Sequence, residues 1–578
     1  MENRRKDEIS ATGRAPGAEP FDEMFKLLGA LQQQRAHFRR RRVRFSRKRR
    51  FSSRELTKVV FRPWFWLVFQ AGMLALIFAF SGKLNLHLPD NNSDDQDYLD
   101  WSQVPLSELI SSPDYLGGHR TLGYPVFLKC VECLSPSFTA LPGCQLALHI
   151  LAVFAFYWGL RHIGFPQLLA LASASSLLYA DLILLNNVAT IDGRPLTYIQ
   201  CFVTDPVALS LAILTVGMLL GVISRPKNKL AWFGLTLGLF FTYQVRPAYL
   251  FLIPLVPLLG LLLLRPVGTR KERIRKRTFL AIGLVVVSSF PLLAFCAFRL
   301  AKFGHFGLTS FGGITSIHIV GQFLTDDLLA ELPLELRQLA LKALDRRKKL
   351  VMGEIPCTFP PAPAFPDSPD QLSRFVRWQP VTEKSQHFDS EQRLIQQLWI
   401  GSATGVDIFI PAATELYGPH DANSKLSQLS WAIIKARPSL YFTWVVNGFC
   451  VAVILALTKN FVFVVLTALL GLLFGLWLAS YGVWFFCVDR QISKGRSITE
   501  RGYSSHLLVV LLTASAFGLA KIILVILVNV PEIRYLQPAG VFLPLIPLVL
   551  IFAILRNIHS WFTGTFARIG INRSAATC

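Results

Sequence analysis

The feature that most constrains this chain is a series of apolar runs, each about as long as a membrane is thick. The first, at 61–80, reads FRPWFWLVFQAGMLALIFAF. About 20 such residues in a helix span the hydrocarbon core of a bilayer. We therefore expect an all-α polytopic membrane protein, with a bundle of about 11 (10–13) transmembrane helices. The further runs lie at approximately 143–160, 165–185, 204–223, 230–243, 249–264, 279–298, 440–457, 461–487, 507–528 and 536–555.

The net charge of +23 is distributed unevenly along the chain. Only 16% of the residues are charged, whereas soluble domains carry about 25%. Much of the positive charge precedes the first apolar run, in RAHFRRRRVRFSRKRR at 35–50. A basic segment beside a transmembrane helix keeps that side cytoplasmic and attracts anionic lipid headgroups. We therefore interpret residues 1–60 as a largely disordered cytoplasmic tail, in preference to an RNA-binding segment, and expect no nucleic-acid partner.

Charge and turn residues divide the rest of the chain. The tail is too long and too charged for a cleaved signal peptide, so the first run is expected to be an uncleaved anchor. Residues 61–300 read as an N-terminal transmembrane catalytic module, with an extracytoplasmic loop at 81–141 that holds short helices. The basic segment RPVGTRKERIRKR at 265–277 is expected to be cytoplasmic. The remaining parts are a mainly helical extracytoplasmic insert at 301–438, C-terminal transmembrane helices at 439–556 and a cytoplasmic tail at 557–578.

The orientation of the last helices raises a conflict. Counting crossings places VDRQISKGRSITERGYSSH, 488–506, outside, whereas its positive charge predicts that it lies inside. The preceding run at 461–487 is long enough to contain a re-entrant or doubled segment, which would reverse the parity. We follow the charges, so Arg534 is expected on the extracytoplasmic side.

Ionisable residues gather at the extracytoplasmic ends of the expected helices. Charged groups near membrane depth are costly and usually face a protein cavity. A carboxylate can take the proton of an attacking hydroxyl, and arginines can hold a phosphate leaving group. This combination suits sugar transfer from a lipid phosphate. The candidates are Asp94, Asp95, Asp97, Tyr98, His119, Arg120, Tyr124, Asp192, Arg194, Asp205, Arg246 and Arg534.

Five short motifs occur in a recognisable order. DDQDY at 94–98 has the form D-x-x-x-Y, and RTLGYP at 120–125 has the form R-x-x-x-Y-P. TDP at 204–206, RP at 246–247 and RY at 534–535 follow. Together they resemble the GT-C superfamily of polyprenyl-phosphate-sugar-dependent glycosyltransferases, in particular the protein O-mannosyltransferase and lipid A aminoarabinose transferase type. The resemblance extends over 61–555.

The resemblance implies a GT-C-like bundle and an inverting glycosyltransferase that moves a hexose or pentose. Asp94 would be the general base, with Asp95 as its competitor, and Asp205 would position the acceptor or the base. Arg246 and Arg534 would hold the donor phosphate. No cofactor is implied, although some members of the superfamily use a divalent metal ion. The further substrate-binding positions would be Tyr98, Arg120, Tyr124 and Tyr535.

Several alternatives stay open on the sequence alone. Asp94 is also explained as a solvated loop residue, Asp205 as an N-cap before Pro206, and Arg246 as a side chain that snorkels to the interface. Two other functions compete with this one: a transporter or flippase, and a catalytically inactive scaffold of the same fold. Because the insert at 301–438 matches no subfamily, the acceptor could be a lipid, a glycan or a protein. We expect a multi-pass protein of a bacterial inner membrane, with its active site on the extracytoplasmic side.

Overall fold

The structure is a computed structural model. It describes residues 62–87, 94–112, 120–180, 186–189, 195–263, 269–309, 312–358, 364–381, 390–487, 500–528, 533–556 and 558. The expected tails, at 1–60 and 557–578, fall outside this part except for residue 558, as do His119, Asp192 and Arg194. Contacts divide the chain into residues 1–65 and 66–578, and nearly all of the described residues belong to the second unit.

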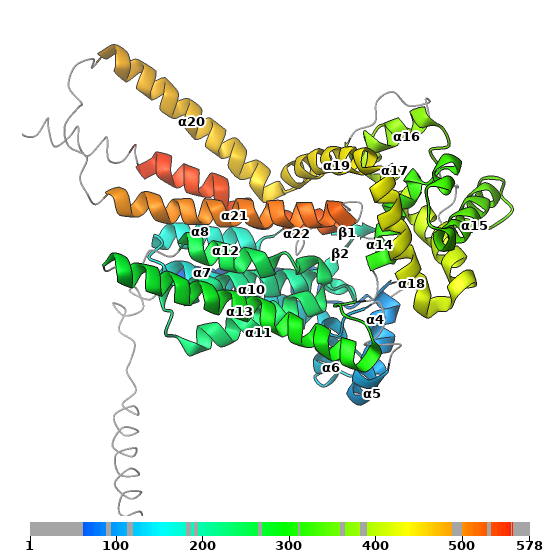
Figure 1. The fold of residues 1–578 in the computed structure, drawn as a ribbon. Helices are drawn as coiled ribbons and strands as arrows, with labels where there is room; N and C mark the ends of the chain where they lie inside the picture. The colour runs from blue at the N-terminus through cyan, green and yellow to red at the C-terminus, as the bar shows by residue number, and fades with distance from the viewer. Residues whose placement is uncertain are drawn as a thin grey trace, which may run out of the picture. The chain divides into compact units, whose positions relative to one another are not determined.

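The described part is almost entirely helical (Figure 1). One β-hairpin interrupts the helices, in which β1 (Asn186–Ala189) pairs antiparallel with β2 (Pro195–Thr197). Seven helices within the described residues are long and apolar enough to cross a membrane. They are Pro63–Phe80 (α3), Leu141–His162 (α7), Asp205–Ser224 (α10), Arg270–Phe303 (α13), Pro438–Thr458 (α19), Val510–Leu527 and Leu536–Arg556.

Four further apolar helices complete the set that hydropathy predicts. Val510–Leu527 belongs to α21 (Glu500–Val528), and Leu536–Arg556 begins inside α22 (Ile533–Gly540). The class of polytopic helical membrane protein is therefore supported, whereas a count of 11 full-length spans is not. The other apolar helices are α8 (Gln167–Leu178), α11 (Lys229–Val245), α12 (Leu252–Leu263) and α20 (Phe461–Cys487).

Small residues allow the central helices to touch at backbone distance. A Cβ at Gly159 of α7 would lie 2.5 Å from the carbonyl oxygen of Gly217 in α10. A Cβ at Gly217 would in turn lie 2.7 Å from the amide nitrogen of Phe156. Glycines of this kind let transmembrane helices approach closely, where van der Waals packing takes the place of the hydrophobic effect. The pair α7–α10 thus forms the centre on which α8 and α11 pack.

The insert is mainly helical, as its Leu and Ala spacing predicts. Its core includes Trp378 and continues into the last helices through Trp444 of α19 and Ile526 of α21. The indole nitrogen of Trp378 donates a hydrogen bond to the Trp444 carbonyl at 3.2 Å. The insert is therefore anchored to the C-terminal helices. Its elements are α14 (Gly312–Val320), α15 (Leu334–Val351), α16 (Pro369–Val376), α17 (Ser390–Ser402), a π-helical segment (Ala403–Phe409) and α18 (Ile410–Ala436).

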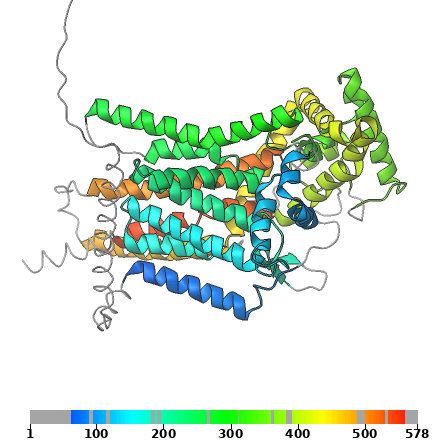
Figure 2. The ribbon, with the colours of Figure 1, turned by 90° about the horizontal axis from the view of Figure 1, so that it is seen from below.

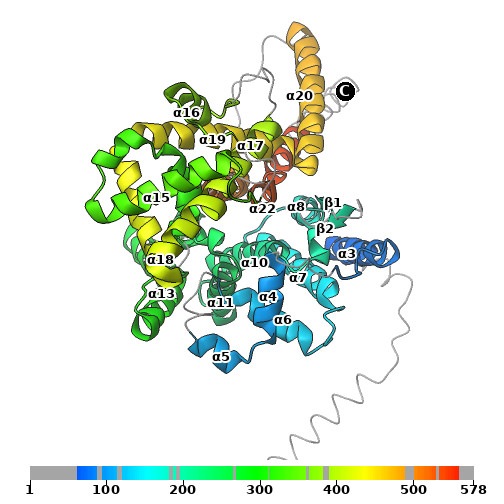
Figure 3. The same cartoon turned by 90° about the vertical axis from the view of Figure 1, so that its right-hand side faces the viewer.

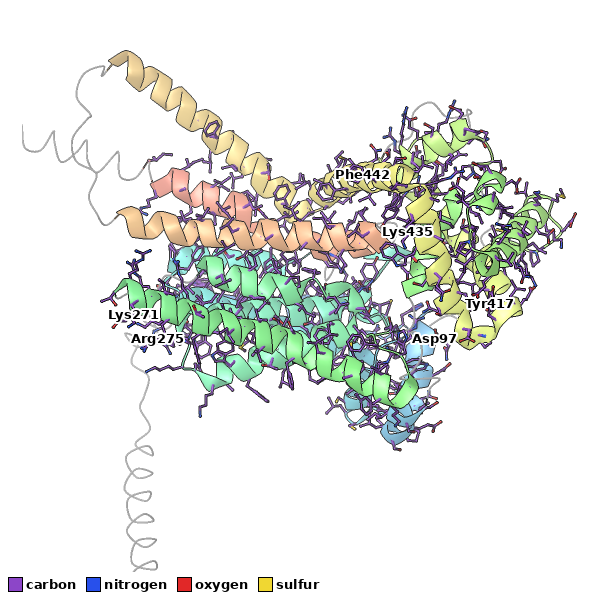
Figure 4. The ribbon with its side chains drawn as sticks, viewed as in Figure 1. Asp97, Lys271, Arg275, Tyr417, Lys435 and Phe442 are labelled. Atoms are coloured by element: carbon purple, nitrogen blue, oxygen red, sulfur yellow. The ribbon has the colours of Figure 1, made fainter. Side chains whose placement is uncertain are left out.

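The two ends of the bundle differ in what lies there (Figure 2). At one end, which we call the insert end, lie the insert and the three short helices of the first loop. At the other, the basic end, α13 begins with Lys271 and Arg275 (Figure 4). The short helices of the first loop are α4 (Asp94–Gln103), α5 (Leu106–Ser111) and α6 (Gly123–Glu132).

The long run at 461–487 is one continuous helix, α20, so the expectation of a re-entrant or doubled segment is wrong. Two hydrogen bonds show how α19 lies against the last helices. The hydroxyl of Tyr441 in α19 donates to the Leu527 carbonyl near the end of α21, at 2.6 Å. Asn460, after α19, donates to the carbonyl of Gly540, the last residue of α22, at 2.8 Å. From there α20 continues to the basic end, where α21 starts (Figure 1). α20 thus runs on from α19 in the direction of the basic end, and α22 begins at the insert end (Figure 1).

Candidate functional site

Two of the expected residues, Asp205 and Arg246, form a buried ion pair. Nη1 of Arg246 contacts Oδ2 of Asp205 and donates a hydrogen bond to Oγ1 of Thr204 at 2.9 Å. The side chain of Asp205 is 2% exposed and that of Arg246 is 12% exposed. Removing one partner of such a pair leaves an uncompensated buried charge. Arg246 does not snorkel towards the membrane interface, so that alternative is wrong.

Two prolines explain how the pair is positioned. Pro247 restricts the residue before it to extended backbone, and Arg246 accordingly ends α11 with φ −148° and ψ 111°. Pro206 lies in the first turn of α10, where a missing N–H group is harmless. Thr204 is the N-cap residue and makes no side-chain capping bond. Asp205 is the first helical residue and binds Arg246 instead, so the N-cap interpretation of Asp205 is also wrong.

Lys521, which the sequence analysis missed, adds a second buried cation. It lies in α21 and is 0% exposed. Its Nζ donates to the Ala248 carbonyl at 3.1 Å and lies 4.2 Å from the centroid of the Tyr249 ring. Because Ala248 lies two residues after Arg246, this bond brings Lys521 close to the ion pair. The available signal was a single lysine in SAFGLAKIILVILV, because a charge inside a span is costly and marks a functional position.

Several polar atoms around this pair make no hydrogen bond within the described residues. Oδ1 of Asp205 and the hydroxyl of Tyr249 are buried in this way. Both side-chain polar atoms of Gln244, which lies two residues before Arg246, share this property. Buried polar groups are normally hydrogen-bonded. These atoms therefore mark positions where the polar groups of a substrate can bind.

The expected residues of the first loop pack against one another. The guanidinium of Arg120 lies 4.7 Å from the centroid of the Tyr98 ring, a cation–π contact. Nη2 of Arg120 is 2.8 Å from Oδ2 of Asp97. The rings of Tyr98 and Tyr124 meet edge to face with centroids 5.2 Å apart. These contacts hold α4 against α6, which gives Arg120 a structural role besides the one expected for it.

Gly123 connects this cluster to the ion pair. A Cβ at Gly123 would lie 2.3 Å from the carbonyl carbon of Gln244 and 2.5 Å from the amide nitrogen of Val245. Only glycine lets the start of α6 approach the end of α11 so closely. Because Tyr124 follows Gly123 and Arg246 follows Val245, the two groups of residues are neighbours. Figure 3, which looks onto the insert end, shows α4 and α6 beside the ends of α10 and α11.

Four expected residues are described by their backbone alone, namely Asp94, Asp95, Arg534 and Tyr535. Asp94 and Asp95 begin α4, four and three residues before Tyr98. Residues at these spacings share one helical face, so both acids lie on the face that Tyr98 occupies. Arg534 and Tyr535 lie in the first turn of α22, at the insert end (Figure 1). Their roles stay predictions, while the backbone brings all five motifs to the same end of the bundle.

A narrow groove begins close to the ion pair. It is lined on one side by Leu209 of α10, one helical turn after Asp205, and by residues at the end of α8. On the other side lie Asn460 and Gln537, and Gln537 follows Arg534 by three residues. An adjoining groove shares Asn460 and Gln537 and continues along α19. The remaining lining residues are mostly apolar: Ser176, Ala180, Val462, Val541 and Pro544 in the first groove, and Leu455, Ala456, Lys459, Leu536 and Gly540 in the second.

Comparisons with known proteins leave the site to be interpreted from its own chemistry. No protein-family profile, no curated protein and no solved structure matches this chain. Among the described residues, no three His, Cys, Asp or Glu side chains lie together in a way that would hold a metal ion. The candidate site thus consists of one buried carboxylate, two buried cations, unbonded polar atoms and the neighbouring acids at the start of α4.

Proposed function

We propose that this protein is a membrane glycosyltransferase that moves a sugar from a polyprenyl-phosphate donor to an acceptor hydroxyl. The observation that carries the proposal is the buried Asp205–Arg246 pair, with Lys521 beside it, at the end of a helical bundle. Cations suit a phosphate leaving group, and carboxylates suit the proton of an attacking hydroxyl. The order of the five motifs, which resembles the GT-C superfamily, supports the same reaction.

The reaction is a single displacement. The acceptor oxygen attacks the anomeric carbon while its proton passes to a carboxylate. The bond between that carbon and the phosphate oxygen breaks, and the lipid phosphate leaves with the electron pair, so the configuration inverts. Asp94 is the proposed base, with Asp95 as the competing residue, because both lie one turn before Tyr98 on α4. Asp205, through its unbonded Oδ1, orients the acceptor hydroxyl.

The proposed topology follows the charges. Basic residues at the start of α13 assign the basic end to the cytoplasm, so the site faces the extracytoplasmic side. The eleven apolar helices give ten crossings, because α19 and α20 act in series. The grooves beside Leu209 and Gln537, which lie near the site, are lined mostly by apolar side chains. A multi-pass protein of a bacterial inner membrane that modifies a lipid, glycan or protein fits this arrangement.

The test is sugar transfer by purified protein in detergent. Radiolabelled polyprenyl-phosphate sugars would be offered with a crude membrane acceptor to the wild type and to Asp94→Asn, Asp95→Asn and Asp205→Asn. Asp100→Asn is the matched control, since Asp100 lies on the same helix α4 and is exposed. Loss of transfer in Asp205→Asn and in one of the two neighbouring variants, with transfer kept in the control, would support the proposal. Transfer that survives all three substitutions would refute the mechanism, and no transfer by wild type with any donor would refute the function.

A translocator of lipid phosphates is the second candidate, favoured by the interruption between α19 and α20. Interrupted helices near the middle of a membrane are typical of transporters. Asn460 marks this interruption and lines both grooves. This function predicts that labelled lipid phosphate crosses the bilayer of reconstituted vesicles without forming a new glycosidic bond. An inactive scaffold would show neither transfer nor movement.

A further inference from the structure

Lys521 lies deeper in the membrane-spanning part than any charge that the motifs predict. It belongs to the span Val510–Leu527 and lies seven residues before Val528, the last residue of α21. At 1.5 Å per residue, this places it about 10 Å inside the end of the helix. Its neighbours Tyr249 and Phe251 present aromatic rings, with centroids 4.2 and 6.0 Å from Nζ.

The bonds that Lys521 makes do not explain why a lysine is buried there. An ammonium group has three protons to donate. The one hydrogen bond described for Nζ goes to the Ala248 carbonyl, and no carboxylate in the described part lies within ion-pair distance. Asp205, the buried acid of this cluster, already binds Arg246. A buried charge is costly unless it is paired, so an ammonium at Lys521 leaves the described cluster with one positive charge in excess.

An anion would balance this excess, and the surroundings decide which kind. The hydroxyl of Tyr249, the residue whose ring lies under Nζ, is buried and makes no hydrogen bond within the described residues, so it is a further donor. Lys521 thus offers a donor from α21, and Arg246 and Tyr249, which lie three residues apart at the end of α11, offer donors from a second segment. Because Lys521 is fully buried among apolar helices, a water-soluble anion would have to enter a dry region. A phosphate that is itself attached to a hydrocarbon chain can reach it from within the bilayer.

We propose that Lys521, with Arg246 and Tyr249, binds the phosphate group of a membrane lipid, specifically a polyprenyl phosphate. This proposal rests on the proposed function, in which the same group is the donor's phosphate and later the leaving group. Lys521 contacts the departing oxygens and stabilises the charge that they gain. The mostly apolar groove beside Leu209, one turn from Asp205, marks the side on which the chain of the lipid leaves the site.

The test is binding, which needs no sugar transfer. Thermal unfolding of the purified full-length protein would be measured with polyprenyl phosphate, with the corresponding polyprenol and with inorganic phosphate. The variant is Lys521→Met, which keeps the length of the side chain and removes its charge. Lys302→Met is the matched control, because Lys302 is exposed at the same end and also donates to a single carbonyl, that of Ile110 at 3.1 Å. Its Nζ also lies near two aromatic rings.

We expect polyprenyl phosphate to raise the melting temperature of the wild type and of Lys302→Met, while polyprenol and inorganic phosphate do not. Lys521→Met is expected to bind polyprenyl phosphate about 10- to 100-fold more weakly, since it loses a charge-assisted contact. Without ligand it should melt no lower than the wild type, because its uncompensated charge is gone. A structural role for Lys521 predicts the opposite, a lower melting temperature.

Each other outcome has a defined meaning. Equal affinity of Lys521→Met and wild type for polyprenyl phosphate would overturn the proposal, as would equal binding of polyprenol. Stabilisation by inorganic phosphate alone would show a soluble-anion site and overturn the lipid assignment. If Lys521→Met did not fold, Tyr249→Phe would test the same site, and an unchanged affinity there would count against it. Binding of polyprenyl phosphate without any sugar transfer would support the phosphate site and refute the proposed glycosyltransferase function. Sugar transfer together with unchanged binding by Lys521→Met would support that function and refute the phosphate site at Lys521.

Discussion

Replacing Gly123 by alanine tests the contact that joins the first loop to the ion pair. The new Cβ would lie 2.3 Å from the carbonyl carbon of Gln244, and 2.5 Å from both the Gln244 oxygen and the Val245 nitrogen. Ordinary contacts of a Cβ begin at about 3.4 Å, so α6 would have to move by about 1 Å. The obstructing atoms are backbone atoms at the end of a helix and cannot rotate away. We expect a loss of about 1–3 kcal/mol in the free energy of unfolding, as for other overpacked sites.

The same displacement moves Arg120 and Tyr124 away from Arg246. A misplacement of about 1 Å can reduce a catalysed rate by about 100-fold, so sugar transfer should fall by this order. The assay is thermal unfolding of the purified variant, followed by transfer at a temperature where it stays folded. Gly143→Ala is the control, because Gly143 lies in the first turn of the neighbouring α7 and a Cβ there meets nothing within 4 Å. If Gly123→Ala and Gly143→Ala melted alike and transferred sugar alike, the close approach of α6 to α11 would be wrong.

Three further predictions concern charged groups. Asp205→Asn should lower the free energy of unfolding by about 3–5 kcal/mol, because Arg246 loses its buried partner; an unchanged melting temperature would contradict the ion pair. Asp97→Asn should cost less than about 1 kcal/mol in the same assay, since Asp97 is 48% exposed, and a larger cost would show that the Arg120 contact was underestimated. In the insert, burial lowers the pKa of His318 to about 4 from 6.5. The unfolded chain therefore binds the proton at a higher pH than the folded chain does, so the insert should lose about 3 kcal/mol of stability as the pH falls from 6.5 to 4. The assay is unfolding followed by fluorescence at a series of pH values, and His318→Leu should remove the dependence on pH.

The positions of the helices could be predicted because each crossing needs a long apolar run. The expected run at 143–160 became Leu141–His162, and the run at 204–223 became Asp205–Ser224. The number of full crossings could not be predicted in this way. Hydropathy indicates that α19 and α20 are apolar, but not that α20 runs on from α19 in the same direction. That information lies in tertiary contacts, such as the bond from Asn460 to Gly540.

The candidate site was predictable where a charge lies at the end of a helix. Asp205 and Arg246 were expected at one end of the bundle, and the structure joins them. Lys521 was missed because the motifs lie at the ends of the apolar runs, although a lysine inside such a run is the more unusual residue. The sequence could not predict the contacts of Arg120. Asp97 and the Tyr98 ring reach Arg120 only because α4 packs on α6.

The helix α20 makes the protein sensitive to the thickness of its bilayer. Its 27 residues correspond to about 40 Å, and α19, which precedes it in series, adds to this length, whereas a hydrocarbon core measures about 30 Å. Such hydrophobic mismatch is relieved by tilting. Since Phe461 is 65% exposed and Leu472 61% exposed, lipid tails rather than protein support this helix sideways. The bond from Asn460 to Gly540 then carries a change of tilt to α22, whose first turn holds Arg534. A thinner or thicker membrane would therefore shift one side of the site without any ligand.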